Sequence, residues 1–359
     1  MSRFVFNSIL ISVTAVLMTG CGMYHRKGLA PARAQQIEQS YQHSEPRFTE
    51  EQKKKILALN PKHVSEQDVR TVLANTPAPH IINIHGGIAS VIPRMVSFSE
   101  FLIGMGYPAI SLTNPSDGTY SFSCYESSRK IAGVIAWYYE KDGLRPMMVG
   151  HSQGGIQAVK ILDKFAGPPS STLNVWNPLT WEKEARTQIV DPLTGKTRPV
   201  VGLQLPYTTS VGAGGLTRLL PNQWDMLFRL RTIPDSVEEF TGFCKEYDIL
   251  GGDFMGYGSA NEFESGGTAT VRNVWLPMEY NHGEIPDSKH LLDDPAMVDW
   301  INHYQPDEAP VSHAELDVEF DGDNSHILWA ADVWYSIKKH WVIELQRLIR
   351  ARPGSKEHP

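Results

Sequence analysis

The chain has 359 residues, of which 41% are hydrophobic and 20% are charged, a composition typical of a globular protein with a substantial core. The formal net charge is −7, and the longest basic run is only Lys53 to Lys55, which argues against a nucleic-acid partner. The length allows one large domain or two of ordinary size.

The first residues predict a secretion signal. Arg3 precedes an apolar stretch from Phe4 to Met18, which is short for a bilayer span. Leu-Met-Thr-Gly-Cys at 17–21 resembles the lipobox of bacterial lipoproteins. We therefore expect residues 1–20 to be a signal peptide and Cys21 to carry a lipid that anchors the chain at the bacterial cell envelope, facing the periplasm or on the outer membrane. The alternative is an uncleaved membrane anchor.

Residues 21–78 predict a polar tether with two short helices, at Glu50–Leu59 and Ser65–Ala74, packed on the edge of a larger domain. No chemistry is assigned to this segment. Beyond Cys21, the chain holds two cysteines, Cys124 and Cys244. An oxidising compartment would allow them to pair, and two buried free thiols fit the sequence equally well.

Apolar strands and amphipathic helices alternate from residue 79, where the main domain (79–359) is expected to begin. The predicted elements, in chain order, are a strand at Ile81–Ile84, a helix at Arg94–Gly104, a strand at Tyr107–Leu112, a helix at Cys124–Glu140, a strand at Pro146–Val149 and a helix through Phe165. This alternation predicts an α/β fold with a parallel sheet covered on both faces.

After Pro168 the pattern is looser. The predicted elements are strands at Val200–Leu205, Tyr247–Leu250 and Val271–Leu276, helices at Leu216–Phe240, Ala296–Tyr304 and Ile327–Ile349, and an alternating run at Ala314–Phe320. The stretch at about 206–245 is the candidate cap over a binding site. Four of its apolar residues would bind acyl chains or belong to the core, namely Trp224, Leu227, Phe228 and Leu230.

Two glycine-containing motifs carry the predicted chemistry. Gly150-x-Ser152-x-Gly154 follows a strand and precedes a helix, the context of a nucleophile elbow, in which a sharp turn exposes the serine hydroxyl. His85-Gly86-Gly87 ends an earlier strand, as does the loop that donates an oxyanion N–H in lipases. The expected oxyanion donors are the backbone N–H groups of Gln153 and Gly87.

With both motifs in this order, the chain from about residue 80 resembles the α/β-hydrolases, and Gly-His-Ser-Gln-Gly-Gly at 150–155 is similar to the elbow of bacterial lipases. The resemblance implies the α/β-hydrolase fold, with a mostly parallel sheet, helices on both faces and an inserted cap. It also implies a triad of serine, acid and histidine in that chain order.

Three histidines are candidates for the catalytic base. His282 is favoured because it follows Val271–Leu276, the expected last core strand. His326 is the rival, since it immediately precedes the C-terminal helix, and His290 is a weaker third candidate.

The orienting acid has more candidates than the base. Asp253 is favoured, because it ends a strand-like run between the elbow and His282. Asp248 and Glu262 are alternatives, and a catalytic His326 would bring in Asp287 or Glu279.

The sequence thus predicts a serine hydrolase of the lipase, carboxylesterase or thioesterase type, acting through an acyl-enzyme on a small-molecule or lipid ester. No metal or organic cofactor is implied. The alternatives are an amidase or peptidase with the same triad, and a non-catalytic envelope-binding lipoprotein on a hydrolase scaffold.

Overall fold

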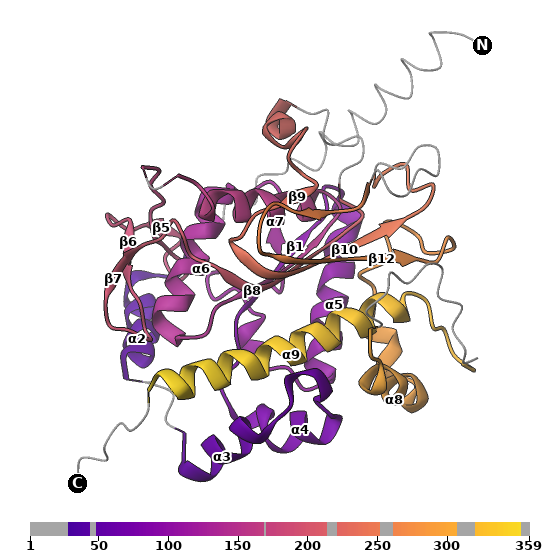
Figure 1. The fold of residues 1–359 in the computed structure, drawn as a ribbon, viewed down its shortest axis with the longest axis horizontal. Helices are drawn as coiled ribbons and strands as arrows, with labels where there is room; N and C mark the ends of the chain where they lie inside the picture. The colour runs from indigo at the N-terminus through magenta and orange to yellow at the C-terminus, as the bar shows by residue number, and fades with distance from the viewer. Residues whose placement is uncertain are drawn as a thin grey trace.

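A six-stranded sheet forms the centre of the computed structural model, which describes residues 28–43, 48–168, 170–213, 221–251, 261–306 and 320–352. All neighbouring strands are parallel, in the order β12-β10-β8-β3-β1-β2. Figure 1 shows this sheet in the middle of the molecule. The strands are β1 (Ile81–His85), β2 (Phe122–Ser123), β3 (Met147–His151), β8 (Leu205–Val211), β10 (Val237–Lys245) and β12 (Thr270–Leu276). The predicted α/β architecture with a parallel sheet is therefore confirmed.

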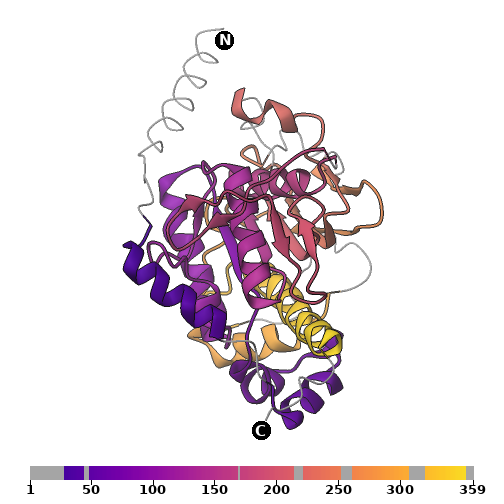
Figure 2. The same cartoon turned by 90° about the vertical axis from the view of Figure 1, so that its left-hand side faces the viewer.

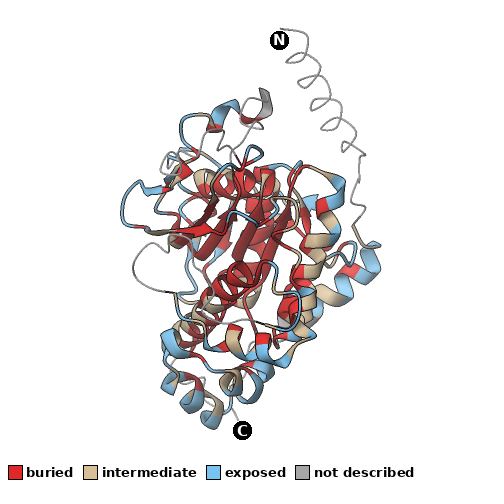
Figure 3. Cartoon of the chain, turned by 90° about the vertical axis from the view of Figure 1, so that its right-hand side faces the viewer, coloured by how far each residue is buried: buried red, intermediate tan, exposed pale blue. Residues whose placement is uncertain are grey.

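Helices cover both faces of the sheet. One face packs on α5 (Ile92–Gly104), α8 (Pro295–His303) and α9 (Ile327–Ala351), and the other packs on α6 (Ser128–Asp142) and α7 (Gln153–Phe165). Successive strand residues point to opposite faces, so Ile81 belongs to the first core and Ile82 to the second. Figure 3 shows the sheet as almost wholly buried.

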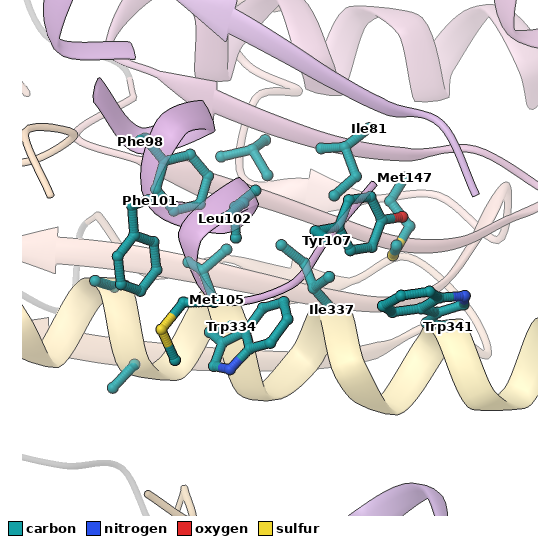
Figure 4. Packing of buried hydrophobic residues seen from close by; sticks show 14 of the residues in the cluster. Ile81, Phe98, Phe101, Leu102, Met105, Tyr107, Met147, Trp334, Ile337 and Trp341 are labelled. Atoms are coloured by element: carbon teal, nitrogen blue, oxygen red, sulfur yellow. The ribbon is translucent and has the colours of Figure 1, made fainter. Parts of the chain in front are cut away.

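The long helix α9 carries much of the first core. Trp334 and Trp341 are fully buried against α5 and the segment that follows it (Figure 4). The Trp341 ring lies edge-on to Tyr107, with 4.8 Å between the ring centroids, and its indole N–H donates to the carbonyl of Pro77. Aromatic packing of this kind fixes α9 against the segment that follows α5.

The segment before β1 forms the two predicted short helices, α3 (Glu50–Ala58) and α4 (Glu66–Thr71). The Gln346 side chain on α9 donates to the carbonyl of Ile56, so α3 is held on the outer side of α9 (Figure 1). A further helix, α2 (Pro31–His43), lies beside α6, where Glu38 pairs with Lys141 (Figure 2).

The connections between the main helices and strands contain short strands and 3₁₀ helices. Two-stranded sheets form between β4 (Trp176–Asn177) and β5 (Glu182–Lys183), between β6 (Gln188–Val190) and β7 (Thr197–Pro199), and between β9 (Thr232–Ile233) and β11 (Glu264–Ser265). Short 3₁₀ helices include η1 (Pro61–His63), η2 (Leu73–Asn75), η3 (Ala89–Val91), η4 (Ala109–Ser111), η6 (Pro221–Met226) and η8 (Lys289–Leu292).

The strand predicted at Tyr107–Leu112 is wrong. This segment contains η4, and the edge strand next to β1 is β2, at Phe122–Ser123. Pro108 precedes η4 and cannot donate to a strand ladder, while Ile110 is exposed rather than buried. The other large apolar residues of the segment, Tyr107 and Leu112, are buried in the first core.

The helix predicted at Leu216–Phe240 is also wrong, as is the strand at Tyr247–Leu250. Within the described residues, the first region contains η6, β9 and the start of β10, because Pro221 and Pro234 interrupt any helix there. Tyr247–Leu250 forms a turn in which Tyr247 has a φ of 53°.

These differences reduce the range of residues that could form the expected cap. The two ends of the range 206–245 are the central strands β8 and β10, so only the connection between them lies outside the sheet. The strand expected at Val200–Leu205 is shifted, since β8 begins only at Leu205. The strand at Val271–Leu276 and the helices at Ala296–Tyr304 and Ile327–Ile349 are confirmed within a few residues.

Some expectations fall on residues that the structure does not describe. They are the signal peptide with Cys21, the favoured acid Asp253 and nearly all of the run Ala314–Phe320. Among the described helices, none is both long and apolar enough to cross a membrane. Cys124 and Cys244 are both buried and form no disulfide with each other, and the thiol of Cys244 contacts the carbonyl oxygen of Asn261 at 3.3 Å.

Candidate active site

Ser152 lies at a sharp turn between the end of β3 and the start of α7. Its φ of 55° and ψ of −120° are strained for a residue with a side chain. The surrounding backbone holds this conformation, because the Ser152 N–H donates to the carbonyl of Val211 at 2.8 Å and the Ser152 carbonyl accepts from Gly155 at 2.9 Å. The turn therefore presents the serine at the carboxyl edge of the sheet.

Two glycines of the motif allow the close packing of this turn. A Cβ on Gly154 would lie 2.1 Å from the carbonyl oxygen of Ile84 on β1. A Cβ on Gly150 would lie 2.6 Å from the carbonyl oxygen of Gly154. Both neighbours are backbone atoms, so no side chain could move aside to make room.

His282 and Asp248 complete a continuous chain of hydrogen bonds with the serine. Nε2 of His282 lies 2.9 Å from Ser152 Oγ, and Nδ1 of His282 lies 2.7 Å from Oδ2 of Asp248. His282 follows β12 and Asp248 follows β10, so both come from connections at the carboxyl edge that also carries Ser152. This is the edge at which open parallel sheets place their ligand sites.

The environment of Asp248 favours its charged form. Burial opposes the charge, but the hydrogen bond and the charge of His282, together with the N–H of Gly251, lower the pKa of the Asp248 carboxyl below its ordinary value. A carboxylate only accepts hydrogen bonds, so Nδ1 of His282 carries the proton. When the imidazole is neutral, Nε2 carries no proton and can accept the hydrogen of the serine hydroxyl.

The residues expected to form the oxyanion hole lie together beside the serine. A Cβ on Gly86 would lie 3.1 Å from Cβ of Ser152, and a Cβ on Gly87 would lie 2.3 Å from Oε1 of Gln153. The Gly87 carbonyl accepts a hydrogen bond from the Tyr125 hydroxyl at 2.7 Å. Gln153 is the first residue of α7, where backbone N–H groups lack acceptors within the helix.

The rival base His326 has a different setting. It has a φ of 65° at the start of α9, and its ring packs edge-on against Tyr280 with 4.9 Å between centroids. Burial lowers its pKa. The weaker candidate His290 lies on η8. The hydrogen bonds of Ser152 and of Asp248 thus lead to His282 and not to these two histidines.

Of the remaining candidate acids, two form hydrogen bonds with other side chains and one is exposed. Glu262 accepts from the indole N–H of Trp275 at 3.0 Å, and Asp287 accepts from the hydroxyl of Ser97. Glu279 is exposed. Asp248, offered by the sequence only as an alternative, is thus the acid that the described residues place against His282.

Sequence reasoning missed one histidine that the structure places at this site. His151 is fully buried, and its Nε2 lies 2.6 Å from the backbone carbonyl oxygen of His282. It is the residue directly before Ser152, so the signal was its place in the motif, but its partner lies 131 residues further along the chain.

The connections that follow β8, β10 and β12 carry exposed apolar side chains. Phe228 is 91% exposed and Trp224 is 62% exposed, both between β8 and β10, whereas Leu230 is buried. Further exposed apolar residues follow β10 and β12, namely Tyr247, Ile249, Leu250 and Met278. Large exposed apolar side chains near one edge are typical of a surface that binds apolar ligands.

Comparison of the chain with protein-family models, curated proteins and solved structures finds no match. The geometry of the site is therefore the main ground for a functional proposal.

Proposed function

We propose that this chain is a serine hydrolase of the α/β-hydrolase type that cleaves carboxylic esters. The observation that carries the proposal is the position of His282, whose ring bridges Ser152 Oγ and Asp248 Oδ2. Ser152, Asp248 and His282 follow one another in the order that this fold uses. The strained serine turn between a strand and a helix adds independent support.

The proposed reaction has two halves. Ser152 Oγ attacks the ester carbonyl carbon while its proton passes to Nε2 of His282, and the N–H groups of Gln153 and Gly87 stabilise the resulting oxyanion. The tetrahedral intermediate then breaks its bond to the alcohol oxygen, which takes the proton from His282. Water attacks the acyl-enzyme by the same route, releases the carboxylic acid and returns the proton to Ser152.

Exposed apolar side chains favour an ester with an apolar acyl group. Phe228 and Trp224 would cover an acyl chain that extends from the serine, and burial of one such side chain contributes about 1.5–3 kcal/mol. An amide substrate would use the same groups, so the acyl preference alone does not separate an esterase from an amidase.

We also propose that the chain is lipid-anchored at the bacterial envelope through Cys21, after removal of residues 1–20. The apolar stretch and the Leu-Met-Thr-Gly-Cys sequence support this location, which would place the enzyme near membrane lipid esters. Incorporation of labelled palmitate into the wild type, lost in Cys21→Ser, tests the anchor.

The test of the activity uses the detergent-solubilised full chain. Wild type should react covalently with a fluorophosphonate and hydrolyse p-nitrophenyl butyrate, and Ser152→Ala should do neither. A matched panel of anilides then separates amide from ester cleavage. A folded wild type that shows neither labelling nor turnover would contradict the proposal and favour a binding protein on this scaffold.

A further inference from the structure

A second histidine, His151, lies next to the candidate base His282. His151 is the last residue of β3, its side chain is fully buried, and its ring centroid lies 5.1 Å from that of His282. Its contact with His282 is made to the backbone: Nε2 of His151 lies 2.6 Å from the His282 carbonyl oxygen. The residue before the nucleophile thus holds the main chain of the base.

The chemistry of this contact fixes the proton on the His151 ring. A carbonyl oxygen only accepts, so Nε2 of His151 must carry the hydrogen. Burial, with the adjacent His282 ring, lowers the pKa of His151 to about 3, and the ring is neutral at physiological pH. Its other nitrogen, Nδ1, faces Gly86, where a Cβ would come within 3.0 Å. His151 is therefore a fixed donor of one hydrogen bond, to the His282 carbonyl.

A second side chain holds the next carbonyl of the same segment. Arg94, on α5, donates from Nη1 to the carbonyl of Gly283 at 3.0 Å and from Nη2 to Glu284 at 2.7 Å. The consecutive carbonyls of residues 282 and 283 are thus held from two different elements. Of these two anchors, only His151 also belongs to the turn that carries the nucleophile.

We propose that His151 is a positioning residue, which sets the distance between His282 Nε2 and Ser152 Oγ by holding the backbone of the base. The inference rests on the proposed hydrolase function. Because His151 and Ser152 are adjacent, one strand end fixes both the nucleophile and the base. The neutral ring also adds no repulsion when His282 becomes positively charged during the reaction.

Two substitutions at residue 151 separate positioning from packing. His151→Gln can place an amide N–H near the position of Nε2, whereas His151→Leu fills the space and leaves the His282 carbonyl without its donor. We expect His151→Leu to lower kcat on p-nitrophenyl butyrate by about 100-fold with little change in KM, because a displacement of about 1 Å at reacting groups has a cost of that order. His151→Gln should retain most of the wild-type kcat.

Met148→Ala is the matched control, because it creates a buried defect in the same strand without touching His282. Its kcat, measured well below its own Tm, should stay close to that of wild type. Equal losses in His151→Leu and His151→Gln, or a loss in Met148→Ala as large as that in His151→Leu, would overturn the positioning role.

A separate readout distinguishes failure of this inference from failure of the proposed function. The far-downfield proton resonance of the His282–Asp248 hydrogen bond should be present in wild type and in His151→Gln, and shifted or broadened in His151→Leu. An unchanged resonance in His151→Leu would contradict the inference even if no ester is cleaved. Absence of fluorophosphonate labelling in wild type bears instead on the hydrolase function.

Discussion

Oδ2 of Asp248 lies 2.7 Å from Nδ1 of His282, while Oδ1 of the same carboxylate accepts the N–H of Gly251 at 2.8 Å. Both oxygens are therefore engaged, and the second contact fixes the carboxylate in the orientation that the imidazole needs. An acid held in this way keeps its histidine in one tautomer, with the basic nitrogen toward the serine.

Asp248→Asn should lower kcat by about 10⁴-fold, because the amide would favour the wrong tautomer of His282 while leaving the shape of the site intact. Asp253→Asn is the matched control and should remain active. The measurement is steady-state turnover of p-nitrophenyl butyrate. If Asp253→Asn lost the activity and Asp248→Asn kept it, the acid would be Asp253.

The nucleophile turn could be predicted from sequence because all of its determinants are local. Gly150, Ser152 and Gly154 lie within five residues, and the strand before them and the helix after them have clear patterns. The candidate base His282 could be placed for a similar reason, since the apolar run of β12 precedes it closely.

The sequence places the candidate acid Asp248 less well than His282, because it does not reveal the strand that precedes Asp248. The apolar residues of Leu216–Phe240 have helical spacing, so the sequence assigns the start of β10 (Val237–Lys245) to a helix. In the structure, parallel strands on both sides stabilise β10. With that strand assigned correctly, Asp248 stands three residues after its end. The role of His151 depends on a contact between distant segments, which no local pattern carries.

His326→Asn should leave turnover nearly unchanged. Residue 326 has a φ of 65°, a conformation that asparagine adopts readily, and its ring packs on Tyr280 rather than on the serine. His282→Asn should lower kcat by up to about 10⁶-fold, since it removes the group that takes the serine proton. The reverse order of effects would make His326 the base.

Gly154→Ala should destabilise the fold by about 3 kcal/mol, because its Cβ would meet the Ile84 carbonyl oxygen at 2.1 Å and the backbone must shift. Gly322→Ala is the control, since the atoms nearest its Cβ would be the ends of two side chains, the terminal methyl group of Met297 at 3.1 Å and Oδ2 of Asp294 at 3.8 Å. Urea unfolding of both variants measures the difference. Equal stabilities would show that the turn tolerates a wider separation from β1.

Phe228→Ser should lower kcat/KM about 10-fold for p-nitrophenyl esters of long acyl chains and leave the short-chain esters unaffected, because an exposed aromatic ring can cover only a chain that reaches it. Ile110→Ser is the control: Ile110 is also exposed, but it lies on η4, outside the connections that follow β8, β10 and β12. A chain-length profile unchanged by Phe228→Ser would place the acyl group elsewhere.

The burial of His151 predicts a pH dependence of stability that its substitution should reduce. The folded protein keeps this ring neutral down to a pKa of about 3, whereas the unfolded chain takes up the proton near the ordinary value of 6.5. Between these two values the unfolded state binds more protons, so the free energy of unfolding contributed by His151 is complete above pH 6.5 and falls as the pH is lowered.

His151→Gln has no titrating group at this position, so its free energy of unfolding should depend less on pH between 6.5 and 4 than that of wild type. Asp248 and His326 also have lowered pKa values and contribute to acid sensitivity in both proteins, so the difference between the two profiles isolates His151. Urea titrations at a series of pH values give both curves. Parallel curves would mean that His151 takes up its proton near pH 6.5 in the folded protein as well. Below that pH a positively charged ring beside His282 would then oppose the imidazolium that the proposed mechanism requires.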